Sequence, residues 1–235
     1  MSTNRLLKAI LPLAIFICLL IPLGSAGAAN DTTLPAFSSF VASVVDGQAN
    51  VVRGVYVPEV LALRVLQQPV GDDASVLRLD GVATQFNAAA QNHVIGLLAH
   101  NDKAGASYAG LQIGQEVRIV YGDGRVDYYV VNRLASYQAL QTGGEVKNFL
   151  DLGSNITYTV QDIFTMFYTG AGHVTFQTCI LKDANPSWGR FFVTAVPVHA
   201  MGTLQESQKY ITHPRQDAQL IRQTFDFLAG ILNLR

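Results

Sequence analysis

Residues 174–196 form the stretch VTFQTCILKDANPSWGRFFVTAV, and this stretch decides the fold. Its two ends, 174–181 and 191–196, are rich in β-branched and aromatic residues, which is typical of strands. Pro186 to Gly189 interrupts the pattern and favours a turn. We therefore expect two neighbouring strands, with Cys179 near the end of the first and Arg190 at the start of the second.

Further short apolar runs predict more strands. They cover residues 51–57, 62–66, 94–99, 117–121 and 126–131. Asp123-Gly124 between the last two runs is the strongest hairpin signal in the chain. Many short strands separated by turn signals favour an antiparallel barrel or sandwich, so the fold class is mainly β.

A few segments indicate helices or stay open. Residues 108–111 favour one helical turn, and residues 217–234 carry apolar side chains at the spacing of an amphipathic helix. Residues 134–150 fit either a helix or a loop, whereas residues 155–168 fit either a strand or a helix. We therefore expect few helices, one of them at the C-terminus.

The first 28 residues have the order of a secretory signal peptide. Arg5 and Lys8 precede an apolar run of residues 9–23, and small residues follow it. The length of the run favours cleavage after Ala28 over retention as an anchor, since a membrane span usually needs about 20 apolar residues. We expect residues 29–50 to be a spacer, 51–200 the main domain and 201–235 a helical extension.

Composition excludes several classes of protein. Of the 235 residues, 49% are hydrophobic and 14% are charged, which favours a filled core over disorder. The formal net charge is −1, without a block of like charge, so nothing indicates a nucleic-acid partner. The five histidines show no H-x-x-x-H or H-x-E pair, and we therefore expect no metal and no cofactor.

Cysteine usage singles out one thiol. Cys18 lies in the apolar leader, so a mature chain would hold Cys179 alone and could form no internal disulfide. A lone cysteine in an exported protein indicates a reactive thiol or a partner chain, and the alternative is a buried, inert residue. Alternation along residues 174–181 places Cys179 on the less apolar face, which favours the reactive thiol.

Two other side chains are candidates for chemistry. Arg190 would stand beside Cys179 if their strands pair, where a guanidinium can stabilise developing negative charge. His100 ends an apolar strand and opens a loop, a position where catalytic side chains are often displayed. For His173 and His199 we favour structural or surface roles.

The motif Thr175-Phe176-Gln177-Thr178-Cys179, followed by Arg190 on the next strand, resembles the sortase signature T-L-x-T-C then Arg. Residues 96–101, GLLAHN, resemble the sortase segment that carries the catalytic histidine, and residues 111–117 resemble its L-x-x-G-D-x-V run. Phe176 replaces the usual Leu, and Gln115 replaces the usual Asp. The resemblance covers about residues 51–196, with His, Cys and Arg in the family order.

This resemblance implies an eight-stranded β-barrel and an exported cysteine transpeptidase. Cys179 would attack a peptide bond of a sorting signal, His100 would act as acid and base, and Arg190 would stabilise the oxyanion. A backbone donor at a bend over residues 178–180 would make Thr178 a substrate-binding residue. The implied partners are a sorting-signal peptide and an amine acceptor at the cell surface; a cysteine peptidase and a non-catalytic binding protein remain alternatives.

Overall fold

The computed structural model describes residues 33–72, 74–142, 145–170 and 172–198. The predicted signal peptide and the predicted C-terminal helix lie outside these residues. Within them, no helix is long and apolar enough to cross a membrane.

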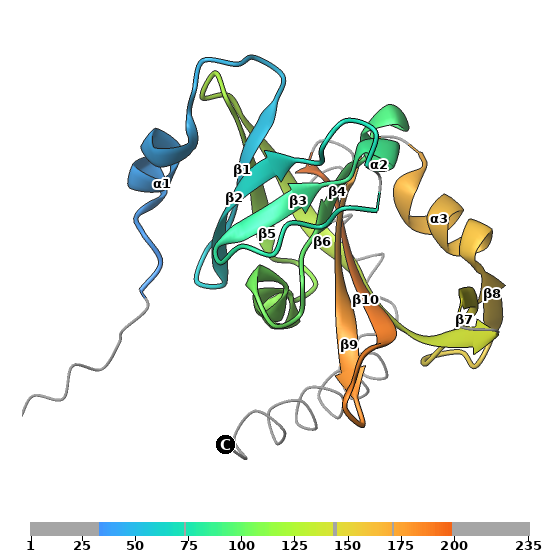
Figure 1. Cartoon of the computed structure of the whole chain (residues 1–235). Coiled ribbons are helices and arrows are strands. Elements are labelled where there is room, and N and C mark those ends of the chain that lie inside the picture. The colour runs from blue at the N-terminus through green and yellow to red at the C-terminus, as the bar shows by residue number, and fades with distance from the viewer. Residues whose placement is uncertain (1–32, 73, 143–144, 171, 199–235) are drawn as a thin grey trace, which may run out of the picture. The chain divides into compact units, whose positions relative to one another are not determined.

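Eight strands close into a barrel (Figure 1). Neighbouring strands follow the order β10-β9-β4-β3-β2-β1-β5-β6, and β6 pairs back onto β10 to close the ring. The strands are β1 (Val52–Val57), β2 (Leu61–Gln67), β3 (Val82–Gln85), β4 (Ile95–Leu98), β5 (Glu116–Tyr121), β6 (Val126–Thr142), β9 (Val174–Lys182) and β10 (Asn185–Pro197). The mainly β class and the eight-stranded barrel are therefore confirmed.

The predicted hairpin at Asp123-Gly124 is confirmed, because β5 and β6 pair in register from Glu116↔Val130 to Val120↔Val126. Gly124 has a φ of +88°, in the left-handed region that glycine enters without steric cost. β6 continues well beyond the predicted end of its strand, to Thr142.

The segment that fitted a helix or a loop is instead strand. Its first half completes β6, and its second half forms β7 (Glu145–Asp151). β6 pairs with β10 on one side and β7 on the other, so hydrogen bonds to both neighbours fix an extended backbone in spite of a weak local pattern.

The ambiguous segment 155–168 contains both predicted conformations. It forms the short strand β8 (Thr157–Thr159) and then helix α3 (Val160–Tyr168). Thr159 caps the helix: its hydroxyl accepts from the Asp162 amide at 3.1 Å, and its own amide donates to the Asp162 carboxylate at 2.9 Å. This reciprocal pair is a capping box, which sets the point where strand gives way to helix.

The other helices are short. They are α1 (Phe37–Val44), α2 (Asn87–Gln91) and the 3₁₀-helix η1 (Ala104–Gly110). η1 contains the predicted helical turn. α1 lies inside the predicted spacer, and it buries Phe40 and Val44 against Tyr56 and Val120 of the barrel strands. Part of that spacer therefore belongs to the folded unit, because its apolar side chains lose contact with water.

Alternation along the strands produces two packed layers. On β10, Phe191, Val193 and Ala195 point into the barrel, whereas Phe192 points outward. The outward layer, which we call the outer aromatic cluster, packs α2 and α3 against the barrel. Its buried members are Ala89, Val94, Leu98, Tyr137, Phe149, Ile163, Phe167, Tyr168 and Phe192.

Candidate functional site

Cys179 lies on the outer face of the barrel. The side chains of Phe176, Thr178 and Ile180 are buried, whereas Gln177 and Cys179 are half-buried, as the sequence pattern predicts. The thiol forms no disulfide. It is therefore partly accessible and close to apolar packing, rather than enclosed in the core.

Arg190 stands directly across the strand ladder from Cys179. The antiparallel pairing of β9 with β10 matches Arg190 with Cys179. Directly paired residues of an antiparallel ladder project to the same face, with Cβ atoms about 5 Å apart. The hairpin expected from the sequence therefore places Arg190 and Cys179 opposite each other on the same face of the two strands.

Two backbone carbonyls hold the Arg190 guanidinium. Its Nη1 donates to the carbonyl of Gly189 at 2.9 Å and to that of Ser187 at 3.3 Å. The positive charge of Arg190 also acts on Tyr168 of α3. Burial and the nearby Tyr108 raise the pKa of Tyr168, and Arg190 reduces that rise. The guanidinium is thus positioned between the hairpin connection and the outer aromatic cluster.

His100 lies beyond β4, on the other side of β9. β4 pairs with β9 in parallel, with Leu98 beside Gln177, and the Ala99 amide donates to the Gln177 carbonyl at 3.2 Å. Leu98 and Gln177 are the last paired residues; His100 follows two residues after Leu98, beyond the end of β4, and Cys179 follows two residues after Gln177 on β9.

The three candidate side chains thus belong to neighbouring parts of the barrel, here the candidate row: His100 after β4, Cys179 on β9 and Arg190 on β10, with adjacent strands about 4.8 Å apart. Tyr137 on β6 pairs with Arg190, is fully buried and accepts a hydrogen bond from Arg133 at 3.1 Å, so it packs beside the candidate row. Tyr137 was not predicted, since it lies in the segment that fitted a helix or a loop. Burial raises the pKa of Tyr137 to about 12.

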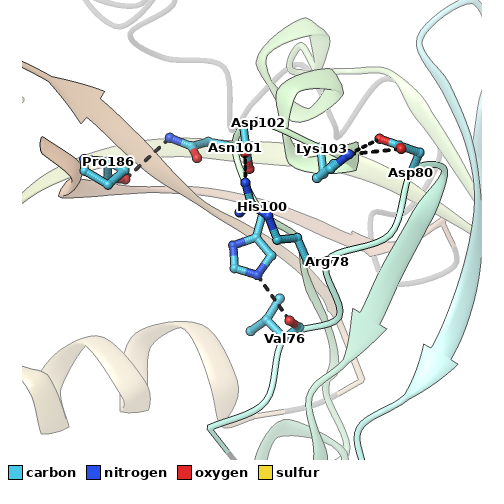
Figure 2. A network of polar contacts seen from close by, with 8 residues as sticks. All are labelled: Val76, Arg78, Asp80, His100, Asn101, Asp102, Lys103 and Pro186. Atoms are coloured by element: carbon cyan, nitrogen blue, oxygen red, sulfur yellow. Dashed lines mark hydrogen bonds and ion pairs between the residues drawn. The ribbon is translucent and has the colours of Figure 1, made fainter. Parts of the chain in front are cut away.

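The ring of His100 has a defined hydrogen-bond partner. Its Nε2 lies 3.1 Å from the carbonyl oxygen of Val76, in the connection between β2 and β3 (Figure 2). A carbonyl oxygen only accepts, so this contact requires the hydrogen on Nε2 and leaves Nδ1 of the neutral ring without one.

Gly105 permits close packing behind the row. A Cβ at this position would lie 2.6 Å from the His100 carbonyl and 2.7 Å from the Ala99 carbonyl, and would collide with the Thr178 hydroxyl. Only a residue without a side chain allows η1 to pack here against both β4 and β9.

Thr178 faces the barrel interior, on the opposite side of β9 from Cys179. Its side chain is 7% exposed, and its hydroxyl has no hydrogen-bond partner among the described residues. The predicted bend at 178–180 is wrong, because the ladder keeps its register from Thr194↔Thr175 to Gly189↔Ile180. A contact between Thr178 and substrate could therefore come only from its backbone.

The remaining candidates serve other purposes. The His173 ring contacts the Phe167 carbonyl at 3.1 Å, a contact that ties β9 to α3 and fits the expected structural role. His199 lies outside the described residues. Within the described part of the chain, no group of three His, Cys, Asp or Glu side chains is arranged to hold a metal ion.

Comparison with known proteins finds similarity among solved structures alone. No family model and no curated protein matches the chain. Among solved structures, Listeria monocytogenes sortase A is 14% identical, with a TM-score of 0.41, over 63% of this chain and 88% of that one. Actinomyces oris sortase C-1 is 13% identical, with a TM-score of 0.44, over 71% and 82%. A Clostridium perfringens sortase D5 transpeptidase is 11% identical, with a TM-score of 0.40, over 70% and 89%.

Proposed function

We propose that this chain is an exported cysteine transpeptidase of the sortase type, with Cys179 as nucleophile, His100 as acid and base, and Arg190 as the group that stabilises the oxyanion. The observation that supports the proposal is the pairing of Cys179 with Arg190 across β9 and β10, together with the position of His100 just beyond β4, which pairs with β9 on its other side. A thiol, an imidazole and a guanidinium meet the needs of acyl transfer.

In the first half of the reaction, the Cys179 thiolate attacks the carbonyl carbon of the scissile peptide bond. The carbon–sulfur bond forms while the carbonyl π electrons move to oxygen, and Arg190 stabilises the resulting negative charge. The oxyanion then collapses and the carbon–nitrogen bond breaks. His100 gives a proton to the departing amine, which leaves a thioester on Cys179.

In the second half, an acceptor amine attacks the thioester. His100 takes the proton that this amine loses, the new carbon–nitrogen bond forms, and the carbon–sulfur bond breaks to return the thiolate. The Val76 carbonyl supports the charged imidazole before His100 gives up its proton and after His100 regains it, in the role that a carboxylate fills in other triads.

We propose a sorting-signal peptide of the L-P-x-T-G type as the acyl donor, cleaved between Thr and Gly, and an amine of the cell wall or of another surface protein as the acceptor. The signal-like order of residues 1–28 supports a site of action outside the cytoplasm. A cysteine peptidase would share the first half-reaction but transfer the acyl group to water.

The test is incubation of the full chain with a sorting-peptide analogue that carries a thiol-reactive group in place of the scissile bond. We expect one mass adduct, mapped to Cys179, and none on Cys179→Ala. Cys18 remains in that variant and reports indiscriminate alkylation. The absence of an adduct on Cys179 contradicts the proposal.

A second measurement separates transfer from hydrolysis. The chain is given an uncleaved sorting peptide together with an amine acceptor, and the products are separated by mass. Ligated product supports transpeptidation. Free acid alone indicates a peptidase, and peptide bound without cleavage indicates a binding protein.

A further inference from the structure

The Val76 carbonyl that contacts His100 lies between two fixed points. The carbonyl of the preceding residue, Ser75, accepts from the Gln68 side-chain amide at 2.8 Å. The amide of the following residue, Leu77, donates to the Thr84 hydroxyl at 2.9 Å. Hydrogen bonds on both sides thus set the direction in which Val76 presents its oxygen.

Both anchoring side chains are buried. Thr84 is fully buried and Gln68 is 3% exposed. Gln68 also accepts from the Asn87 amide at 3.0 Å, at the start of α2. A buried polar group that loses its partner costs free energy, so these contacts resist opening more strongly than contacts at the surface.

Two exposed ion pairs lie next to the buried hydrogen bonds of Thr84 and Gln68. Arg78 pairs with Asp102 and Lys103 pairs with Asp80, both between the β2–β3 connection and the loop that follows His100 (Figure 2). The side chains of Arg78, Asp102 and Asp80 are exposed, with relative accessibilities of 60%, 49% and 83%. Exposed ion pairs contribute little to holding a geometry.

We propose that Thr84 and Gln68 are positioning residues for His100. They hold the Val76 carbonyl against Nε2, which keeps the hydrogen on Nε2 and directs Nδ1 toward the substrate. The proton-transfer part of this inference rests on the proposed function, whereas the tautomer part depends on the geometry alone.

The first readout is the tautomer of His100, measured by ¹⁵N chemical shifts in full chain labelled at histidine, with the signal assigned by its loss in His100→Gln. We expect Nε2–H to dominate in the unmodified chain and in Thr84→Ser, which keeps the hydroxyl. Thr84→Val removes the hydroxyl without changing the shape of the side chain, and should give a mixture of both tautomers.

Thr194→Val is the matched control. Thr194 is also a buried threonine, and its hydroxyl donates to the Asn132 side chain at 2.8 Å, away from the Val76 carbonyl. Its replacement should leave the His100 tautomer unchanged. If Thr84→Val fails to fold, Gln68→Met tests the other anchor and should shift the tautomer in the same direction.

The second readout is the rate of adduct formation with the sorting-peptide analogue. We expect Thr84→Val to lose about tenfold or more, since small misplacements of a catalytic group carry large penalties in rate, and Thr84→Ser to stay near the unmodified chain. An unchanged tautomer in folded Thr84→Val or Gln68→Met overturns the inference. A shifted tautomer in a chain that forms no adduct in any variant supports the positioning and contradicts the proposed function.

Discussion

The β9–β10 hairpin and the end of β4 hold their candidate site residues in different ways. Cys179 and Arg190 are cross-strand partners within a long antiparallel ladder, with packed residues on both faces. His100 lies beyond the last residue of a four-residue strand, and its ring is held by a hydrogen bond from a neighbouring connection. The core therefore places the thiol and the guanidinium, whereas polar contacts of a loop place the imidazole.

The largest expected effect comes from breaking the hairpin's outer packing. Phe192 is 1% exposed and stacks on Phe167 with ring centroids 4.1 Å apart. Phe192→Ala should lower the free energy of unfolding by about 3–5 kcal/mol, because it leaves a cavity between α3 and the barrel. Denaturant titration measures this change.

Tyr128→Ala is the control for that measurement. Tyr128 is also an aromatic residue of a barrel strand, but it is 46% exposed. Its loss should change stability little. Equal destabilisation by the two variants would show that the outer aromatic cluster does not fix the hairpin.

The next effect concerns chemistry on the hairpin. Arg190→Lys keeps the positive charge but loses the planar fork of donors. We expect the rate of adduct formation to fall about 10²- to 10³-fold, comparable with the loss of one oxyanion donor. The unfolding midpoint should stay close to that of the unmodified chain.

Arg125→Lys provides the matching substitution elsewhere. Arg125 pairs with Asp127 at 2.5 Å on β6, at the exposed β5–β6 hairpin. The rate of adduct formation by Arg125→Lys should equal that of the unmodified chain. Should Arg190→Lys react equally fast, the guanidinium has no part in stabilising the oxyanion.

Gly105 tests the junction where the two regions meet. Gly105→Ala pushes a methyl group against the Ala99 and His100 carbonyls and against Thr178 of β9. We expect a loss of about 1–3 kcal/mol in unfolding free energy, typical of overpacking, together with slower adduct formation because His100 shifts. Both are measured on the same preparation.

Gly110 lies in the same 3₁₀-helix, so Gly110→Ala is the control for Gly105→Ala. Its added methyl group would meet the Val60 side chain at 3.1 Å, which is a contact that can relax. A small loss of unfolding free energy for Gly110→Ala with a large loss for Gly105→Ala would show that the steric constraint lies where Gly105 packs against β4 and β9. Similar effects at both positions would indicate a general cost to the helix.

The smallest change in stability is expected for the exposed ion pair beside the loop that follows His100. Arg78→Ala removes an exposed ion pair with Asp102, which should contribute between about 0 and 1 kcal/mol and less at high salt. Denaturant titrations at low and high salt measure it. A larger loss than that of Thr84→Val would mean that the ion pair, rather than the buried anchors, holds the connection against His100.

The sequence indicated the candidate site residues more readily than the strands that surround them. Cys179, Arg190 and the strands that carry them follow from alternation and turn signals within 23 consecutive residues. Tyr137, the second half of β6 and β7 did not follow, because their extended backbone depends on pairing with partners distant in the chain. Local propensity is weak where such pairing supplies the hydrogen bonds.

By itself, then, the sequence determined the mainly β class, the β5–β6 hairpin and the outward face of Cys179, because these depend on residues close together in the chain. The closure of the barrel, the parallel pairing that brings the end of β4 beside β9, and the carbonyl that contacts the His100 ring came from the tertiary structure alone. Those features join segments separated by dozens of residues, and their register is set by core packing that no local pattern records.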